Sequence, residues 1–437
     1  MIFKPEASAL YIPRSDASAN FHRDFITRVL QLLKEKSIPA IDVEKALFSD
    51  GSPLYLTRGY IDHVLMMLWN TGDNASQVIL DLFASKALTQ HSPFKGKSTR
   101  LLGALFWYLE SRQDKSSLVE VPYDVDPTGE YAEIASQVNQ VEMLAQLMSH
   151  IDYLITLDLH SREAALAFEG EGIAVIHLSA HRQFANKLLS EGIVTHGDKN
   201  VIAMSTDLGS LPKTYAVAQL LGVEVAILEK NSISDEAGTT RRVEQTMLSG
   251  NPKGKTVIFI DDMISGGGTG KNAAEKVLSL GAKNVIFLAT HAVFVGDYYK
   301  TIQKMLANPK IRVIVTNTLP IVTDDDNMHA MRIERRVGLP YVFVKNGHEK
   351  SPVKRYAELL DLEPFMIEVM LKVLSAHSIE DIIELLKEDI LELEDPYDLF
   401  EKITGTKLQR KKVTHVYMGD GVFIPLYEES LELQPSN

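Results

Sequence analysis

The segment Val257–Thr269 constrains the fold of this 437-residue chain more than any other. It reads VIFIDDMISGGGT, in which four apolar residues lead into Asp261 and Asp262, and three consecutive glycines precede a threonine. A helical pattern follows at residues 272–280, and a second apolar run follows at 285–289. Strand, loop, helix and strand in this order form the unit of a parallel sheet covered by helices. Open α/β sheets bind ligands just past the carboxyl ends of their strands, so we expect a functional site at this loop.

The glycines and acids of this loop suit a ribose phosphate. Glycines let successive backbone N–H groups approach an anion, and the N-terminus of the following helix adds a favourable dipole. Two carboxylates would repel a bare phosphate, but they can bind ribose hydroxyls or a metal ion that carries phosphate oxygens. The loop has neither the Lys-Ser/Thr ending of a nucleoside-triphosphate loop nor the GxGxxG spacing of a dinucleotide site. The alternative to a ribose-phosphate site is a buried strand followed by an acidic turn with flexible glycines. The candidate ribose-phosphate residues are Asp261, Asp262, Ser265, Gly266, Gly267, Gly268 and Thr269.

Composition and charge exclude several classes of function. The chain has no cysteine, so disulfides, thiolate chemistry and cysteine-ligated zinc are excluded. No apolar run reaches 18 residues and no secretory signal pattern is present, so we expect a cytoplasmic protein with no membrane partner. The net charge of −13 argues against a nucleic-acid-binding surface. A phosphorylated small molecule remains compatible, because Mg²⁺ and a few local cations can reverse the field in one cleft.

The order of patterns along the chain predicts an α/β protein with a C-terminal extension. Apolar runs predict strands near residues 118–122, 154–159, 173–177, 201–205, 223–228, 256–260, 285–290 and 311–316. Helical patterns occupy residues 20–37, 60–88, 100–111, 131–148 and most of 354–402. The last of these has one apolar face and an acidic face, which favours packing on the core or on a neighbouring subunit over membrane binding. The expected domains are 1–150, an N-terminal α/β lobe with helical insertions; 151–335, a phosphoribosyl-binding α/β lobe; and 336–437, a mainly helical extension.

His160 and Asp207 each end a predicted strand, so both can lie on the same rim of a sheet. An imidazole and a carboxylate can ligate a divalent ion that bridges phosphates, with water in the remaining positions. Asp158 would point the same way as His160 if the strand continues, and would then orient the imidazole. Taken alone, His160 also fits a structural histidine, and Lys213 fits a solvated lysine at a helix start.

Several segments together resemble the ribose-phosphate diphosphokinase (phosphoribosyl diphosphate synthetase) family, whose fold is shared with phosphoribosyltransferases. The resemblance runs from roughly residue 20 to 330, and its motifs occur in the family's order. They are FSDG at 48–51, DLHS at 158–161, STDLG at 205–209, the phosphoribosyl loop, Thr-His at 290–291 and Thr-Asn at 316–317. The resemblance implies two phosphoribosyltransferase-like lobes with mostly parallel sheets flanked by helices, in a homo-oligomer.

The resemblance also implies a reaction and a role for each candidate residue. The enzyme would use Mg²⁺ and transfer pyrophosphate from ATP to a ribose 5-phosphate moiety, forming phosphoribosyl diphosphate or a derivative. The implied roles are metal binding by His160 and Asp207, nucleotide binding by Phe48 and Asp50, ribose binding by Asp261 and Asp262, 5-phosphate binding by the glycine loop, and neutralisation of transferring charge by the catalytic Lys230.

Three segments depart from the family's pattern. Asp124–Gly129 replaces an Arg-Gln-Asp segment that contacts ATP, and Ser265–Gly266 replaces an Asp-Thr pair. At Glu229–Ser232 the family has a lysine and one or two arginines that clamp the transferring phosphates, and this chain keeps only Lys230. Arg241 and Arg242 follow about ten residues later, in what we expect to be a solvated helix. Cations supply a large share of catalysis in phosphoryl transfer.

These departures leave two alternatives to the enzymatic interpretation open. The chain would be either a non-catalytic member that regulates or assembles with an active one, or a phosphoribosyltransferase that consumes the activated ribose. The FSDG and DLHS motifs argue against the phosphoribosyltransferase.

Overall fold

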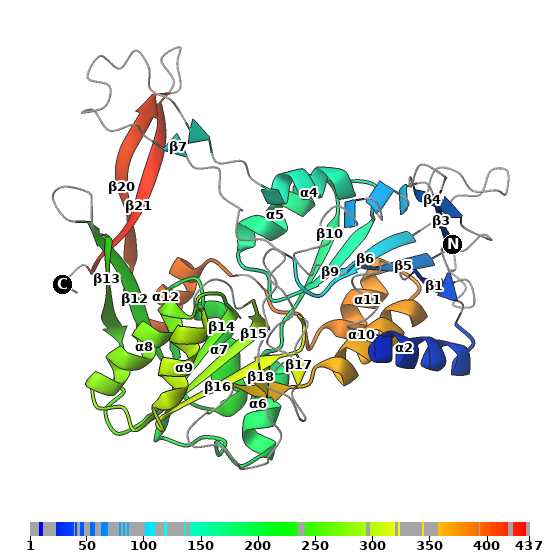
Figure 1. Cartoon of the computed structure of the whole chain (residues 1–437). Helices are drawn as coiled ribbons and strands as arrows, with labels where there is room; N and C mark the ends of the chain where they lie inside the picture. Colours follow the sequence, from blue (N-terminus) through cyan, green and yellow to red (C-terminus); the bar gives the residue numbers. More distant parts are fainter. Residues whose placement is uncertain are drawn as a thin grey trace.

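The chain forms two mostly parallel sheets, each covered by helices (Figure 1). This architecture is seen in a computed structural model and confirms the predicted fold class. The structure describes residues 8–11, 23–38, 40–41, 44–47, 53–56, 63–68, 78–79, 82–83, 85–86, 101–109, 118–119, 135–136, 140–234, 241–293, 298–319, 322–323, 343–344, 357–392, 394–417 and 423–433.

The first sheet has six parallel strands in the order β10-β9-β6-β5-β1-β2. Their bounds are Ser8–Tyr11 (β1), Ala40–Ile41 (β2), His63–Leu68 (β5), Leu101–Phe106 (β6), Tyr153–Leu157 (β9) and Ala174–Leu178 (β10). The helices expected over β5 and β6 are therefore wrong at those residues. Both strands are continuous apolar runs, HVLMML and LLGALF, which periodicity alone cannot distinguish from buried helix.

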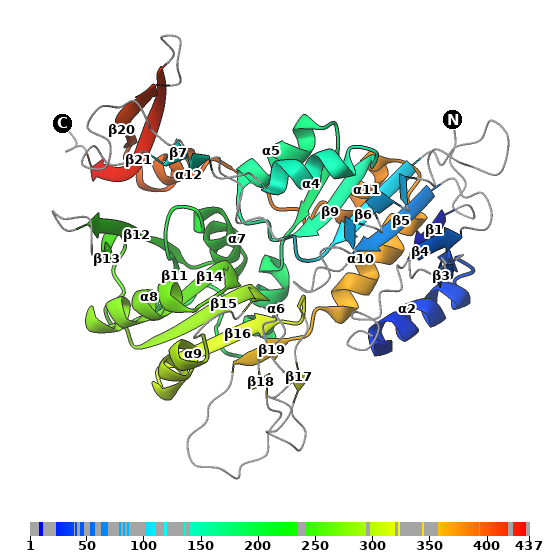
Figure 2. The ribbon, with the colours of Figure 1, turned by 45° about the horizontal axis from the view of Figure 1, so that its top comes forward.

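Alternate residues of the first sheet pack against different helices. Val64, Met66 and their neighbours face α4 (Gln140–Met148) and α5 (Arg162–Gly170) in one apolar cluster. Leu65 and Met67 face the opposite side, where α2 (Arg23–Glu35), α10 (Glu363–Ser375) and α11 (Ile379–Leu386) lie (Figure 2). Helices of the C-terminal extension thus pack into the core of the lobe that is built on the first sheet, which we call the first lobe. The amphipathic pattern favours either this packing or packing on a neighbouring subunit.

The second sheet has seven strands in the order β13-β12-β11-β14-β15-β16-β19, all parallel except β13. Their bounds are Val201–Ser205 (β11), Glu224–Ser234 (β12), Arg241–Ser249 (β13), Thr256–Ile264 (β14), Asn284–Ala292 (β15), Ile311–Thr316 (β16) and Glu358–Leu360 (β19). Helices α6 (His181–Ser190) and α7 (Leu211–Leu221) cover one face, and α8 (Gly268–Ser279) and α9 (Tyr298–Ala307) cover the other.

Two expectations for the second sheet fail beside β12. This strand was expected to end near residue 228, but it continues through Lys230 to Ser234 and pairs with β13. Arg241 and Arg242 consequently begin a strand and not a helix. The antiparallel pairing of two adjacent segments provides backbone partners that the local sequence pattern does not reveal.

The division between the sheets does not coincide with the expected boundary at residue 150. Strands β9 and β10 pair within the first sheet, so the division falls between Leu178 and Val201. The extension also ends differently from its helical expectation: after α12 (Pro396–Thr404) it forms an antiparallel hairpin, β20 (Leu408–Tyr417) and β21 (Phe423–Leu433). Among the described residues there are also three small strand pairs: β3 (Glu44–Leu47) with β4 (Pro53–Leu56), β7 (Leu118–Val119) with β8 (Ala135–Ser136), and β17 (Val322–Thr323) with β18 (Phe343–Val344). None of the helices in the described ranges is long and apolar enough to cross a bilayer.

Buried histidines predict a loss of stability in acid. Burial is the largest cause that lowers the pKa of His63, His150, His177, His181 and His291. For His63 it lowers the pKa from 6.5 to about 4, so the unfolded chain binds more protons between these values and stability falls as pH falls. We expect His63→Phe to reduce the stability lost between pH 7.5 and pH 5 by about 2 kcal/mol in urea titrations. An equal loss in both proteins would contradict this.

Candidate functional site

The phosphoribosyl loop lies between the end of β14 and the start of α8. Gly267 precedes the helix with a left-handed φ of 76°, which turns the chain so that α8 begins at Gly268. The first N–H groups of a helix have no intrahelical partner, and they lie at the positive end of its dipole. The loop therefore presents backbone donors of the kind that bind phosphate, and phosphate binding at this loop stays a prediction.

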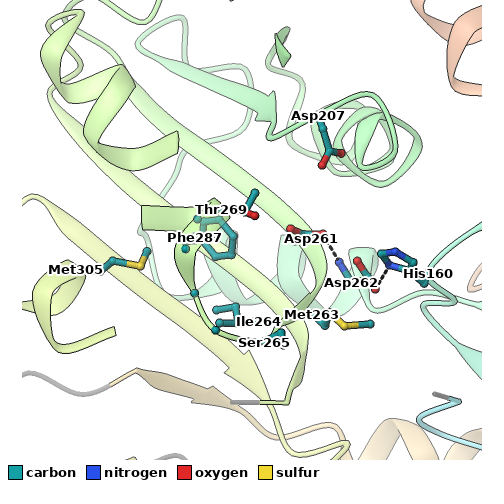
Figure 3. A pocket seen from close by; sticks show the side chains of 14 residues that line it. His160, Asp207, Asp261, Asp262, Met263, Ile264, Ser265, Thr269, Phe287 and Met305 are labelled. Carbon is teal, nitrogen blue, oxygen red and sulfur yellow. Dashed lines mark hydrogen bonds and ion pairs between the residues drawn. The ribbon is translucent and has the colours of Figure 1, made fainter. Parts of the chain in front are cut away.

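A pocket of about 350 Å³ opens at this loop and brings together residues from several elements (Figure 3). This volume is within the range of small-molecule sites. It is lined by His160, Asp207, Asp261, Asp262, Ser265, Gly266, Gly267, Gly268 and Thr269, all predicted, and by Met263, Ile264, Gly270, Phe287 and Met305, which were not. The ribose-phosphate and metal candidates thus share one pocket.

The two adjacent carboxyl groups at the end of β14 have opposite pKa shifts. Burial raises the pKa of Asp261 well above its usual value, and the neighbouring charges of Asp262 and Asp207 add to this. Burial would also raise the pKa of Asp262, but the Lys213 ammonium and a hydrogen bond from His160 lower it overall. The pocket therefore has an excess of negative charge around Asp261, which a cation or a hydroxyl donor would relieve.

The turn after β9 joins the first sheet to this pocket. Four consecutive residues, the last of β9 and the first three of the turn, each contact a side chain from the second lobe. The atom pairs are Leu157 O with His291 Nε2 at 2.9 Å, Asp158 Oδ2 with Thr290 Oγ1 at 2.5 Å, Leu159 O with Lys213 Nζ at 3.0 Å, and His160 Nδ1 with Asp262 Oδ2 at 3.0 Å. His160 therefore reaches a second-lobe site from a first-lobe strand.

Asp158 does not orient the imidazole, contrary to expectation. Its φ of 47° ends the strand geometry, so its side chain turns away from the direction that period-two alternation gives. The buried carboxylate accepts hydrogen bonds from Ser179 Oγ at 2.7 Å, from Ala180 N at 3.0 Å and from Thr290 Oγ1. The partner of His160 is Asp262, and Asp158 instead holds the turn against two other segments.

Lys213 is a buried counter-charge and not a solvated lysine. Its side chain lies in the first turn of α7, and the residue is only 5% exposed. Its Nζ donates to Leu159 O, and its charge lowers the pKa of Asp158 and of Asp262 against the opposing effect of burial. The spacing STDLGSLPK did not reveal this, because the contact joins residues 54 positions apart.

The donors at the pocket fit a magnesium ion that is held mainly by phosphates and water. Asp207 accepts from Ser210 N at 3.0 Å through Oδ1, and His160 is held by Asp262 through Nδ1. Within the described ranges, no group of three or more histidine or acidic side chains is arranged to hold a metal ion. A hydrated Mg²⁺ needs only one or two protein ligands when substrate phosphates supply others.

Comparisons with known proteins agree with this geometry. Residues 178–309 match the model of the phosphoribosyl transferase domain. The chain is 28% identical to ribose-phosphate pyrophosphokinase of Pyrococcus furiosus over 66% of this chain and 89% of that protein. It is 27% identical to ribose-phosphate pyrophosphokinase 1 of Streptococcus agalactiae over 72% and 89% of the two chains. These similarities support a divergent member of the ribose-phosphate pyrophosphokinase family.

A solved structure supports the fold of this chain. The crystal structure of phosphoribosylpyrophosphate synthetase from Mycobacterium smegmatis matches with a TM-score of 0.55 and 22% identity, over 84% of this chain and 98% of that chain. About a third of the present chain lies outside its matches to the pyrophosphokinases of Pyrococcus and Streptococcus.

Some predicted site residues cannot be placed against the pocket. Phe48 and Asp50 lie outside the described residues, as does the whole segment Asp124–Gly129 that replaces the family's ATP-contacting residues. The backbone of Lys230 lies in β12, opposite Gln245 of β13, and its side chain is outside the description. In the sequence, Thr290 and His291 stand out only as a motif of the family. In the structure Thr290 is hydrogen-bonded to Asp158 and His291 to the carbonyl of Leu157, at the end of β9.

The three loop glycines should differ in their tolerance of alanine. A Cβ at Gly267 would combine a left-handed φ with a contact of 3.1 Å to Ile302, whereas a Cβ at Gly266 would meet nothing within 4 Å. We expect Gly267→Ala to lower the free energy of unfolding by about 1–2 kcal/mol and to weaken ribose 5-phosphate binding. The matched Gly266→Ala should stay within about 0.5 kcal/mol of wild type in denaturant titrations. If both substitutions lowered the free energy of unfolding equally, the left-handed φ of Gly267 would not require glycine.

Proposed function

We propose that this protein transfers a pyrophosphoryl group from ATP to the anomeric hydroxyl of a ribose 5-phosphate moiety. The observation that carries the proposal is the shared pocket, where the glycine turn and the acids of β14 meet His160 from the other lobe. The glycine turn and the acids alone would also suit a phosphoribosyltransferase, whereas His160 adds a candidate metal ligand that a second phosphate-bearing substrate can use. The names of the relatives support the same reaction.

In the proposed reaction the anomeric hydroxyl oxygen attacks the β-phosphorus of ATP. The bond from that phosphorus to the oxygen bridging the α-phosphate breaks, AMP leaves with this oxygen, and the hydroxyl proton is lost. Asp261 and Asp262 hold the ribose hydroxyls, and the backbone from Gly266 to Thr269 holds the 5-phosphate. Positioning of the two substrates in line is the main contribution that such a pocket makes to phosphoryl transfer.

The remaining roles follow from the donor set and from the family resemblance. His160 and Asp207 would hold Mg²⁺, which when bound neutralises charge on the β- and γ-phosphates. Lys230 would neutralise charge that develops during transfer, and Phe48 and Asp50 would bind the adenine. The acceptor is ribose 5-phosphate or a derivative with a further substituent.

One assay tests this proposal against its competitor. Purified protein with Mg²⁺, ATP and ribose 5-phosphate should form AMP and phosphoribosyl diphosphate, resolved from ADP by ion-exchange chromatography. ADP would indicate an ordinary kinase. No product with ribose 5-phosphate or its larger derivatives, together with retained nucleotide binding, would favour a non-catalytic role, which the cation-poor segments Asp124–Gly129 and Glu229–Ser232 also favour.

A substitution of the clamp lysine separates catalysis from binding. Lys230→Ala should lower kcat about a hundredfold while the dissociation constant of ribose 5-phosphate changes little, because the interaction is made mainly in the transition state. Steady-state kinetics and calorimetry measure the two quantities. An unchanged kcat in an active enzyme would remove Lys230 from the catalytic residues.

A further inference from the structure

The C-terminal extension returns to the first sheet beside the candidate site. After α11, residues 389–391 run antiparallel to the edge strand β10, and an isolated bridge joins Leu178 to Ile390. Ser179 N donates to Asp389 O at 2.9 Å, and Leu391 N donates to His177 O at 3.0 Å. This short segment of the extension is therefore hydrogen-bonded to the first sheet like an added strand.

Two residues of the first lobe contact both this segment and the turn that carries His160. His177 lies between Leu391 O, 2.8 Å from Nδ1, and Leu159 N, 2.9 Å from Nε2. Ser179 bonds to the extension through its backbone, and its hydroxyl donates to Asp158 Oδ1 at 2.7 Å. His177 thus connects the extension to the turn through its imidazole, and Ser179 does so through its backbone N–H and its hydroxyl.

The carbonyl of Leu391 fixes the tautomer of His177. A carbonyl oxygen can only accept, so Nδ1 carries the proton, and the Leu159 N–H can only donate, so Nε2 is unprotonated. The other tautomer would place two donors together at Leu159 and two acceptors together at Leu391. Burial is the main cause that lowers the pKa of His177 to about 4, so the ring is neutral at physiological pH.

The turn needs support of this kind. Asp158 adopts a left-handed φ that is uncommon for residues other than glycine, and His160 follows only two residues later. Both backbone groups of Leu159 are held by side chains, its N–H by His177 and its carbonyl by Lys213. Loss of the His177 acceptor would leave a buried N–H without that partner and would release one side of the turn.

We propose that segment Asp389–Leu391 supports the site through His177 and Ser179, and that His177 is a positioning residue for the imidazole of His160. The kinetic consequence of this proposal rests on the proposed function. Its structural consequence, the rigidity of the turn, is independent of any activity.

Hydrogen exchange at the Leu159 amide measures the structural consequence directly. In His177→Leu this amide should exchange at least about tenfold faster than in wild type, because its acceptor is lost. Leu391→Pro keeps His177 but removes the N–H that binds the sheet, and it should also accelerate exchange at Leu159. His177→Gln retains an acceptor and a donor and should restore part of the protection. His63→Leu is the matched control, since His63 is buried in the same sheet but bonds to Tyr153, and it should leave Leu159 unchanged.

Kinetics with Mg²⁺, ATP and ribose 5-phosphate measure the functional consequence. His177→Leu and Leu391→Pro should lower kcat about tenfold or more and raise the Mg²⁺ concentration for half-maximal rate, with little change in the KM for ribose 5-phosphate. The phosphoribosyl loop should still bind ribose 5-phosphate with normal affinity, because neither His177 nor Leu391 contacts it. Partial recovery of kcat in His177→Gln would match its recovered exchange protection.

The outcomes separate this inference from the proposed function. If wild type forms no AMP, the proposed reaction fails, and the exchange measurement alone decides whether the extension holds the turn. Unchanged exchange at Leu159 in folded His177→Leu and Leu391→Pro would overturn the inference even in an active enzyme. If thermal melting shows that His177→Leu does not fold, Leu391→Pro and Ser179→Ala provide the same test.

Discussion

Replacing Lys213 with methionine should lower the free energy of unfolding by about 3–5 kcal/mol, the typical cost of leaving a buried charge uncompensated. The residue is almost fully buried, and its charge lowers the pKa of both Asp158 and Asp262. Methionine retains much of the length and apolar contact of lysine but provides neither the charge nor the hydrogen bond to Leu159 O. Denaturant titration at neutral pH measures the effect.

A double-mutant cycle identifies the charge as the cause. Adding Asp262→Asn to Lys213→Met should recover part of the loss, because one of the two uncompensated carboxylates is then neutral. Lys213→Arg keeps the charge at this position and should cost less than the methionine variant. If the arginine and methionine variants lost equal stability, packing and not electrostatics would explain the role of Lys213.

The pocket was predictable to the extent that its groups follow one another in the sequence. Apolar residues, acids and glycines in Val257–Thr269 define a strand, a turn and a helix start without long-range information. The expectation that His160 and Asp207 lie on the rim of one sheet is wrong, because β9 belongs to the first sheet and β11 to the second. The two side chains nevertheless line one pocket, because the turn after β9 reaches the second lobe.

Groups that depend on contacts between distant segments could not be predicted. The burial of Lys213 requires α7 to pack against the turn after β9, and the direction of Asp158 requires a left-handed residue that no local pattern marks. Strands β5 and β6 were misread as helices because their apolar runs lack alternation when both faces are buried. The return of the extension to β10 depends on backbone pairing, which leaves no side-chain pattern.

The two acids of β14 should respond to neutralisation in opposite ways. Asp261→Asn should raise the free energy of unfolding of the ligand-free protein, because it removes a carboxyl group whose ionised form is disfavoured by burial and by Asp262 and Asp207. Asp262→Asn should lower it, because Asp262 is stabilised as an anion by Lys213 and His160. Denaturant titration in EDTA measures both effects.

The pH dependence of the Asp261→Asn effect fixes its origin. The folded-state pKa of Asp261 is raised, so between the unfolded value of 3.8 and the folded value the native protein binds more protons than the unfolded chain. Its carboxylate therefore destabilises the fold at neutral pH, and this cost disappears as pH falls toward the unfolded value. The advantage of Asp261→Asn should shrink in the same direction, and a constant advantage would point to packing instead.

Both substitutions should nevertheless weaken ribose 5-phosphate binding, and the double variant should weaken it most. Each removes a charged acceptor for a ribose hydroxyl, worth about 1.5–3 kcal/mol, so the double variant should lose about 3–6 kcal/mol of binding free energy. Calorimetry on folded protein measures the loss, with His63→Phe as a control away from the pocket. Asp261→Asn is the decisive variant, because it should raise the free energy of unfolding and at the same time lower the affinity for ribose 5-phosphate. This combination is expected of a carboxylate that is kept for function at a site where its charge destabilises the fold. Unchanged affinity in the double variant would place the ribose elsewhere.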